Sequence, residues 1–443
     1  MESALDQNLV QIPSGCGDEA ADRGFSKMAK AMRASSILTI ANDIRSLKES
    51  GADVANLTVG DFSPDQFPIP DGLRKNIHES LDRGETNYPP PAGTIELRKA
   101  VRGYVKRTQG MDYPLECFTI VSGGRPSLYG TYRLLVDPGD LVVFPVPSWN
   151  NTNYRDVCQV EVKMVPCRAE DSFQPTADLL RPHLSEARLF VLNTPQNPSG
   201  GVMPRKEVEA FGHLLVEENE RRKETGQKPL YLLYDQIYRS IVFPGYEHFS
   251  PVQLVPECAP YVIHSDGISK GHCSTGLRCG WIFGPAAFAR KALALLTHVG
   301  AWAPKPVQIG AAEWLNDVDA VNAWDEGLID RVQKRLLVLH QGMKDLVEAG
   351  FPVDIVQPQG AIYLSVRFDL VGKTTPSGVV LQNNEDIRKY LLQEAGFALV
   401  PFAAFGATDA DQGGWSRASV GAVSSDELRR ALPRVKKVLE ALS

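Results

Sequence analysis

The sequence predicts an α/β protein with a mainly parallel, seven-stranded sheet between two layers of helices, together with a smaller α+β domain. Between residues 118 and 285, seven short runs rich in β-branched residues recur: FTIVSG, LVVFPVP, EVKMVPC, LFVLNTP, LYLLYDQIY, YVIHSDGISK and CGWIFGP. Several are apolar on both faces, as strands buried between two helical layers are. Segments with helical spacing, such as Val208 to Leu215, separate them. After residue 325, long amphipathic helices surround a few short strands, which is typical of an α+β unit.

The chain is long enough for two domains, because it has 443 residues and 43% of them are hydrophobic. Residues 1–24 are polar and small, and we interpret them as a flexible extension or an arm lying on a partner subunit. A packed body is expected from about Phe25. We expect residues 25–74 to form an N-terminal arm and part of the small domain. Residues 75–325 would form the large domain and residues 326–443 the small C-terminal domain.

Charge and composition favour small-molecule substrates. The formal net charge of −6 argues against binding to nucleic acid or to an anionic membrane surface. The N-terminus lacks a basic start with an apolar stretch, so a cytoplasmic protein is expected. Seven cysteines without a CxxC pair predict buried, reduced thiols and no structural metal.

Glycines follow the first of these runs directly. Parallel sheets bind ligands beyond the carboxyl ends of their strands, so residues at these ends are candidates for one site. Gly123 and Gly124 stand between the run FTIVS and a helical stretch, where backbone amides can approach a phosphate closely. A single pair of glycines at such a position is more often only a tight turn.

Charged residues follow two further runs. Asp235 ends LYLLYD, and a buried carboxylate needs a cation such as a protonated pyridine nitrogen, although a salt bridge or a helix cap would explain an isolated aspartate equally well. Lys270 follows YVIHSDGIS, where burial would lower the pKa of its amine and allow it to form an imine. Arg278 stands eight residues later and could bind a phosphate with both arms of its guanidinium. The joint order of these residues on successive strand ends outweighs the surface role of an isolated lysine or arginine.

From about Ile37 to Leu442 the sequence resembles the class I/II aminotransferases of fold type I, which depend on pyridoxal 5'-phosphate. The matching motifs are Asn87-Tyr88-Pro89 with Gly93, Ser122-Gly123-Gly124, Pro147-Ser148-Trp149, Asn197-Pro198-Ser199-Gly200, Asp235-Gln236-Ile237-Tyr238, Ser269-Lys270 with Arg278, and Arg417. Runs such as NLTVGDFSPDQFPIP and VPFAAFG resemble a bacterial subgroup described as aspartate aminotransferases.

The resemblance implies a role around the cofactor for each matching residue. Lys270 would carry pyridoxal 5'-phosphate as a Schiff base and shuttle the proton, while Asp235 would keep the pyridine nitrogen protonated. Asn197 and Tyr238 would hydrogen-bond the phenolate oxygen. The remaining cofactor contacts would come from Trp149 on the ring face and from Gly123, Gly124, Arg125, Ser269 and Arg278 around the phosphate.

The resemblance also implies the substrates and the assembly. Arg417 would bind the α-carboxylate of an amino acid, close to Gly60 and Asn197. The amino group of an L-amino acid, with aspartate as first choice, would pass to a keto acid such as 2-oxoglutarate. Arg125 and Lys305 are candidates for the distal carboxylate. Tyr88 would reach the phosphate of the neighbouring subunit, which makes the expected enzyme a homodimer with shared active sites.

Two departures from the family pattern leave an alternative open. Gly267 stands where a phosphate-binding serine is frequent, so one hydroxyl contact should be missing. His272 and Cys273 stand close after the lysine, in place of small or apolar residues. They are either structural or mark another reaction of the same cofactor, namely elimination, replacement or C–C bond formation on an amino acid or an S-adenosylmethionine-like substrate. A cofactor-binding regulator without turnover is disfavoured, since every catalytic position is filled.

Overall fold

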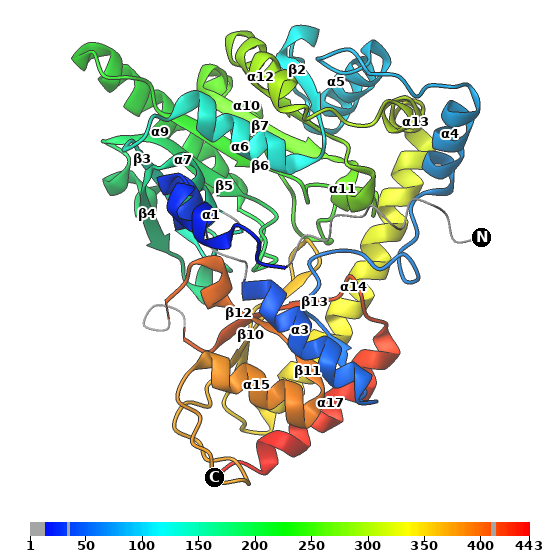
Figure 1. Ribbon diagram of the computed structural model, residues 1–443, viewed down its shortest axis with the longest axis vertical. Helices are drawn as coiled ribbons and strands as arrows, with labels where there is room; N and C mark the ends of the chain where they lie inside the picture. The colour runs from blue at the N-terminus through cyan, green and yellow to red at the C-terminus, as the bar shows by residue number, and fades with distance from the viewer. Residues whose placement is uncertain (1–13, 33–35, 150, 409–412) are drawn as a thin grey trace.

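A computed structural model describes residues 14–32, 36–149, 151–408 and 413–443, and its large domain is built on a seven-stranded sheet (Figure 1). In spatial order the strands are β2 (Phe118–Val121), β8 (Gly280–Phe283), β7 (Val262–Gly267), β6 (Tyr231–Asp235), β5 (Ala187–Asn193), β3 (Leu141–Val146) and β4 (Glu161–Pro166). Strand β8 runs in the opposite direction to the other six strands of this sheet. Each of the seven predicted runs forms one strand, so the predicted fold class is confirmed.

Helices cover both faces of this sheet because neighbouring strand residues point to opposite sides. In β6, Leu232 and Tyr234 pack into one hydrophobic cluster and Leu233 into another. The first face is covered by α4 (Asp71–Asp82), α5 (Ile95–Gln109), α8 (Ala177–Leu180), α9 (Arg205–Thr225), α10 (Pro251–Leu254) and α13 (Lys305–Asn316). The second face is covered by α6 (Gly124–Leu135), α7 (Asn151–Cys158) and α12 (Ala286–Val299).

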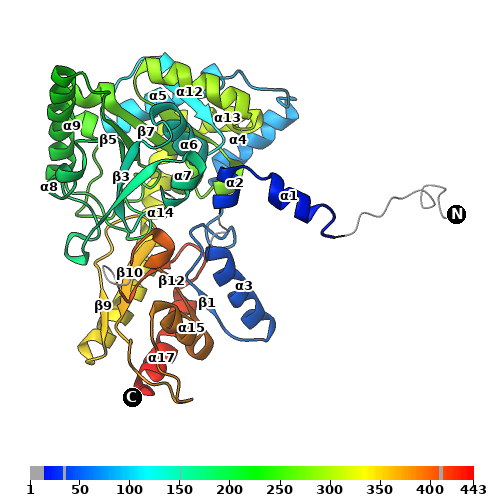
Figure 2. The same cartoon turned by 60° about the vertical axis from the view of Figure 1, so that its left-hand side comes forward.

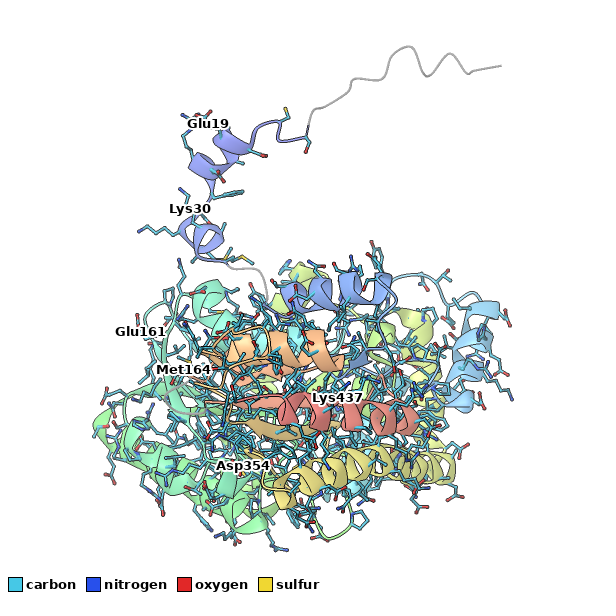
Figure 3. The ribbon with its side chains drawn as sticks, turned by 90° about the horizontal axis from the view of Figure 1, so that it is seen from below. Glu19, Lys30, Glu161, Met164, Asp354 and Lys437 are labelled. Atoms are coloured by element: carbon cyan, nitrogen blue, oxygen red, sulfur yellow. The ribbon has the colours of Figure 1, made fainter. Side chains whose placement is uncertain are left out.

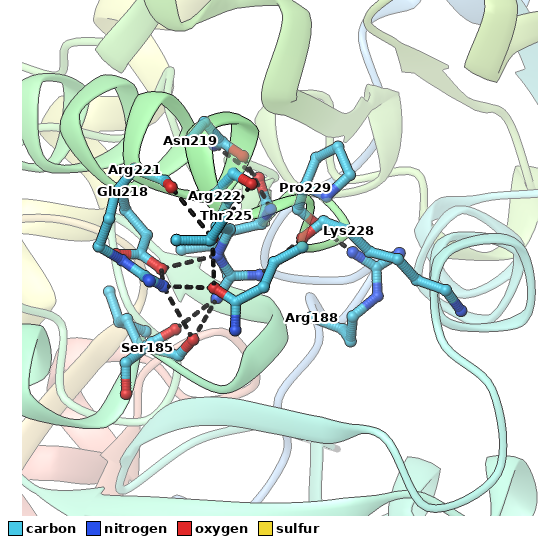
Figure 4. A network of polar contacts seen from close by, with 12 residues as sticks. Ser185, Arg188, Glu218, Asn219, Arg221, Arg222, Thr225, Lys228 and Pro229 are labelled. Carbon is cyan, nitrogen blue, oxygen red and sulfur yellow. Dashed lines mark hydrogen bonds and ion pairs between the residues drawn. The ribbon is translucent and has the colours of Figure 1, made fainter.

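A buried polar network fixes the amino ends of β5 and β6 against the end of α9 (Figure 4). The side chain of Arg222 is 3% exposed; its Nε donates to Glu218 at 2.6 Å and its Nη2 to the carbonyl oxygen of Leu184 at 2.7 Å. Asn219 exchanges two hydrogen bonds with the backbone of Leu230. These contacts hold the segments that precede both strands, whose carboxyl ends carry site residues.

The small domain contains a four-stranded antiparallel sheet and receives chain from the N-terminal side. Its strands, in spatial order, are β12 (Val400–Pro401), β13 (Trp415–Ser419), β10 (Tyr363–Phe368) and β9 (Val353–Ile355). A separate parallel pair joins β1 (Ala55–Asn56) to β11 (Phe397–Ala398). Figure 2 shows the helices of this domain grouped away from the large sheet: α3 (Ser36–Glu49), α15 (Asn384–Ala395) and α17 (Ser425–Glu440).

Helix α14 (Val318–Glu348) connects the two domains without a break. It begins beside α13 and continues along α17, as the long yellow helix of Figure 1 shows. The expected boundary at residues 325 and 326 therefore falls inside one continuous helix. The apolar spacing that marks the second domain starts with Leu328, which packs into the core of the small domain.

The N-terminal segment buries none of its described side chains, although its second helix lies against α7 of the large domain. Its two short helices, α1 (Asp18–Gly24) and α2 (Lys27–Ala31), contain no buried residue, and Figure 3 shows Glu19 and Lys30 projecting away from the domains. The expectation of a packed body from Phe25 is wrong: Phe25 is 50% exposed, because no apolar layer of this chain covers it, and the first buried side chain among the described residues is Ile40. Residues 1–13 of the predicted extension lie outside the described residues.

Two general expectations can be compared with the described chain. All seven cysteines have free thiols, and six of them are buried, whereas Cys16 is exposed. Across the described ranges, no helix combines the length and the apolar character needed to cross a membrane.

Candidate active site

The carboxyl ends of β2, β5, β6 and β7 open onto a cavity of about 260 Å³. Ten of the predicted site residues line it: Gly60, Gly124, Arg125, Trp149, Asn197, Asp235, Tyr238, Ser269, Lys270 and Arg278. Two more lie just behind this lining, Gly123 against Arg278 and Arg417 against Asn197. Residues scattered over more than 350 positions of sequence thus meet at the edge of the sheet where parallel strands place ligands.

Lys270 lies in the four-residue helix α11 (Ile268–Gly271), which begins directly after β7. Its Nζ donates a hydrogen bond to the carbonyl oxygen of Gly60 at 2.7 Å and lies 3.9 Å from Oδ1 of Asp61. Burial lowers the pKa of this amine to about 8, although the Asp61 carboxylate acts in the opposite direction. An amine with such a pKa has a useful neutral fraction near physiological pH and can act as a nucleophile.

Asp235 is the last residue of β6 and is held by its neighbours on β5. Asn193 donates through Nδ2 to the backbone oxygen of Asp235 at 2.9 Å, and its Oδ1 accepts the backbone N–H of Asn197 at 2.8 Å. Burial raises the pKa of the Asp235 carboxyl to about 7, while the N–H of Ile237 partly opposes this shift. No side-chain cation pairs with Asp235 in the described part of the chain, so its ionised form requires a positive charge from a ligand.

Unpaired polar atoms around the cavity indicate the shape of that ligand. Asn197 Nδ2, Ser265 Oγ and Ser269 Oγ are buried without a hydrogen-bond partner among the described residues. Native proteins rarely leave such atoms unpaired, so they are available to a bound molecule. Gly123 adopts φ 80°, and a Cβ atom there would overlap Nη2 of Arg278. Only glycine lets the guanidinium close against this loop, at the amino end of α6, where an anion is favoured. These groups fit a phosphorylated ring with a protonated nitrogen, as pyridoxal 5'-phosphate has.

Arg417 comes from β13 of the small domain and is 2% exposed. Its Nη1 donates to Oδ1 of Asn197 at 2.9 Å and its Nη2 to the carbonyl oxygen of Thr58 at 2.7 Å. The guanidinium carbon lies 4.8 Å from the ring centre of Tyr363 and 4.9 Å from that of Phe405. Its Nε has no partner, and no carboxylate pairs with it within the described ranges. A buried, forked cation of this kind is suited to a ligand carboxylate.

Two aromatic residues face the cavity. The hydroxyl of Tyr238 is hydrogen-bonded to the hydroxyl of Tyr363, and Nζ of Lys270 lies 5.8 Å from the centre of the Tyr238 ring. The guanidinium carbon of Arg125 lies 4.5 Å above the ring centre of Trp149. This cation–π contact holds both side chains at the wall of the cavity.

Four polar residues of the lining were not predicted: Asp61, Asn193, Ser265 and Thr275. Asn193 is the last residue of β5, just as Asp235 is the last residue of β6. The argument from strand ends that identified Asp235 could therefore have identified Asn193 too. Ser265 stands two positions before Gly267, the position at which a hydroxyl is expected to be missing. It brings a hydroxyl of its own to the cavity. The Oγ of Thr275 donates to the Asp61 carboxylate at 2.7 Å, a contact between distant segments that has no local sequence signal.

His272 and Cys273 do not line the cavity. His272 is 1% exposed, contacts the ring of Trp314 edge to face, and has a pKa that burial lowers to about 3, so it is neutral. Burial raises the pKa of the Cys273 thiol to about 12, which keeps it protonated.

Tyr88 and Lys305 also lie outside the cavity of this chain. Tyr88 is 82% exposed, with its ring 5.5 Å from that of Trp302. The Nζ of Lys305 lies 2.6 Å from Oε2 of Glu85 and donates to Oδ1 of Asn87 at 2.6 Å. Its charge is therefore already compensated.

Comparisons with known proteins agree with this geometry. Residues 52–435 match the family described as aminotransferase class I and II. The aspartate aminotransferase of Rhizobium meliloti (strain 1021) is 30% identical over 433 residues, which cover 95% of this chain and 98% of that protein. The aspartate/prephenate aminotransferase of Thermus thermophilus is 30% identical, with 94% of this chain and 99% of that protein covered.

Solved structures show the same relationship. The aspartate aminotransferase from Rhizobium meliloti superposes with a TM-score of 0.84 at 27% identity, covering 95% of this chain and all of that one. The Thermus thermophilus aspartate aminotransferase with maleate gives a TM-score of 0.82 at 27% identity, covering 94% of this chain and all of that one. The chain therefore belongs to the class I and II aminotransferases and is an enzyme of amino-group transfer.

Proposed function

We propose that this aminotransferase takes the amino group from a dicarboxylic amino acid, aspartate first, and passes it to 2-oxoglutarate, with pyridoxal 5'-phosphate bound in the cavity described above. Membership of the family implies dependence on this cofactor. When bound, it supplies an aldehyde that reacts with amines and a ring that withdraws electrons from the substrate Cα. The unpaired groups of Asn197, Ser265 and Ser269 support binding at this place.

The residues of the chain divide the work by their chemistry. With the cofactor bound, the neutral amine of Lys270 would hold its aldehyde group and would take and return the proton at the substrate Cα. The buried carboxylate of Asp235 would keep a proton on the pyridine nitrogen. Asn197 Nδ2 and Tyr238 Oη would donate hydrogen bonds to the phenolate oxygen.

The phosphate and the ring face have their own set of groups. The guanidinium of Arg278 and the hydroxyls of Ser265 and Ser269 would hold the phosphate at the amino end of α6. The indole of Trp149 would stack against the ring.

Substrate binding uses two cations. Arg417 receives the α-carboxylate through its unpaired Nε and its forked guanidinium. Arg125 receives the distal carboxylate, and the observation that carries this assignment is that Arg125 lines the cavity without a carboxylate partner in the described chain. Lys305, the other candidate, is already paired with Glu85. Relatives named aspartate aminotransferase, one of them solved with the dicarboxylate maleate, support the same substrate class.

Other reactions of the same cofactor receive no support. His272 and Cys273, which could have marked elimination or replacement chemistry, lie outside the cavity lining. The relatives carry names of amino-group transfer.

The assembly that we propose is a homodimer with shared sites. Tyr88 forms an aromatic pair with Trp302 and is 82% exposed, so its ring is accessible to a second copy of the chain. In a dimer with two-fold symmetry, each Tyr88 would reach the phosphate in the other subunit.

The substrate assignment can be tested with Arg125→Leu. Losing a charge-assisted hydrogen bond should lower kcat/KM for aspartate by roughly tenfold or more, while kcat/KM for alanine, which has no distal carboxylate, should not fall. Arg205→Leu is the matched control, since Arg205 makes a similar cation–π contact with Phe249 elsewhere. Equal losses for aspartate and alanine would rule out Arg125 as the distal-carboxylate group.

A further inference from the structure

We infer that Tyr363 is a positioning residue: its hydroxyl donates a hydrogen bond to Tyr238 and so directs the single proton of Tyr238 toward the cavity. The inference deepens the proposed function and rests on its assignment of Lys270 and Tyr238. Tyr363 does not line the cavity itself. It therefore acts through Tyr238 rather than on substrate or cofactor.

The two tyrosines meet across the boundary between the domains. Tyr363 is the first residue of β10 in the small domain, and Tyr238 follows β6 in the large domain. Both side chains are buried, at 0% and 2% exposure, and their hydroxyls are hydrogen-bonded to each other. Within the described ranges, neither hydroxyl has a second hydrogen bond. Each hydroxyl therefore has the other as its one hydrogen-bond partner in the described protein, and Tyr238 also lines the cavity.

Counting protons determines the direction of this hydrogen bond. A tyrosine hydroxyl has one proton to donate and lone pairs that accept. If the Tyr238 hydroxyl donates its one hydrogen bond to the phenolate oxygen of the cofactor, as proposed above, it can only accept a hydrogen bond from Tyr363. Tyr363 must then be the donor. Donation to a hydroxyl also strengthens the bond that this hydroxyl makes onward.

The surroundings of Tyr363 favour that direction. The guanidinium carbon of Arg417 lies 4.8 Å from the centre of its ring, and a nearby positive charge makes a phenol a better donor. Burial raises the pKa of Tyr363, and Arg417 is the largest influence opposing this rise. The hydroxyl of Tyr363 also lies close to the backbone of Gly60, since a Cβ atom built there would be 3.2 Å from Tyr363 Oη.

Removing this donor has a spectroscopic consequence. Without it, Tyr238 would donate less strongly, and the phenolate oxygen of the bound cofactor would keep more negative charge. That charge favours the protonated form of the bond between Lys270 and the cofactor. The midpoint of the absorbance titration reports the loss of this proton. It should therefore move to higher pH in Tyr363→Phe, by about half a pH unit to one pH unit.

The experiment is a pH titration of absorbance on purified, cofactor-loaded protein, for wild type, Tyr238→Phe, Tyr363→Phe and the double variant. Tyr390→Phe is the matched control, because it also loses a buried hydroxyl of the small domain, one that donates to Val438. Melting temperatures are recorded for each protein. Tyr363→Leu, which also lacks the hydroxyl, replaces Tyr363→Phe if the latter does not fold.

The result that we expect is an upward shift in Tyr363→Phe, a larger one in Tyr238→Phe, no additional shift in the double variant and none in Tyr390→Phe. An unshifted Tyr363→Phe, or an additive shift in the double variant, would overturn the inference while leaving the proposed function intact. An unshifted Tyr238→Phe would instead show that the assignment of Tyr238 to the cofactor fails.

Discussion

Lys270 and Gly60 are joined by a hydrogen bond of 2.7 Å from Nζ to the carbonyl oxygen, across 210 positions of sequence. Gly60 follows β1, which pairs with β11 of the small domain, whereas Lys270 follows β7 of the large domain. The reactive amine is thus held where the two domains meet. Its protonation depends on burial and on the charges that both domains bring to it.

The first prediction concerns the pKa of Lys270. In cofactor-free protein, acylation of Lys270 by acetic anhydride should rise with pH to a midpoint near 8 rather than near 10.5, because burial favours the neutral amine. Mass spectrometry of the peptide that contains Lys270 measures the extent, with exposed lysines of the same digest as references. Since the folded protein binds fewer protons than the unfolded chain between these two values, its stability should increase with pH through this window.

Asp61→Asn provides the control for this prediction. The Asp61 carboxylate favours the charged amine, so its removal should move the midpoint of acylation further down. A midpoint near that of ordinary lysines, or an upward shift in Asp61→Asn, would contradict this account of the amine.

Arg417→Lys should weaken the binding of the amino acid by about 2 kcal/mol, which is roughly thirtyfold, while cofactor binding is retained. A lysine keeps the charge but loses the fork that reaches Asn197, Thr58 and the substrate together. The apparent affinity for aspartate and the melting temperature are measured side by side. Arg388→Lys is the control, because Arg388 is equally buried but pairs with Asp43 and Glu385 away from the cavity.

The two readouts for Arg417 separate a ligand role from a structural one. A purely structural contact between the domains would lower the melting temperature at unchanged affinity, as expected for Arg388→Lys. That pattern in Arg417→Lys would remove Arg417 from the substrate site.

Shared active sites can be tested by mixing two inactive variants. Lys270→Ala subunits keep Tyr88, and Tyr88→Ala subunits keep Lys270, so each mixed dimer should contain one complete site. Equal mixing should restore about a quarter of the wild-type activity, since about half of the dimers are mixed and each has one good site of two. Proven subunit exchange without recovery would argue that Tyr88 does not complete a neighbouring site.

The sequence predicted the parts of the fold that depend on local patterns. The seven apolar runs became the seven strands, and the strand-end argument identified Asp235 and Lys270, because alternation and strand ends are properties of neighbouring residues. It missed Tyr363 and the contact of Thr275 with Asp61, which arise only when distant segments meet. Helix α14 runs through the expected domain boundary, since helical spacing does not reveal where one core ends.

The most direct measurement of the central claim follows the amino group itself. Protein loaded with pyridoxal 5'-phosphate is mixed with ¹⁵N-aspartate and 2-oxoglutarate, and the products are identified by mass spectrometry, with Lys270→Ala as the control. We predict ¹⁵N-glutamate from the wild type and none from Lys270→Ala, which should fold normally but form no borohydride-reducible bond to the cofactor. Label that remains in aspartate or leaves as ammonia, or transfer that survives in Lys270→Ala, would contradict the account.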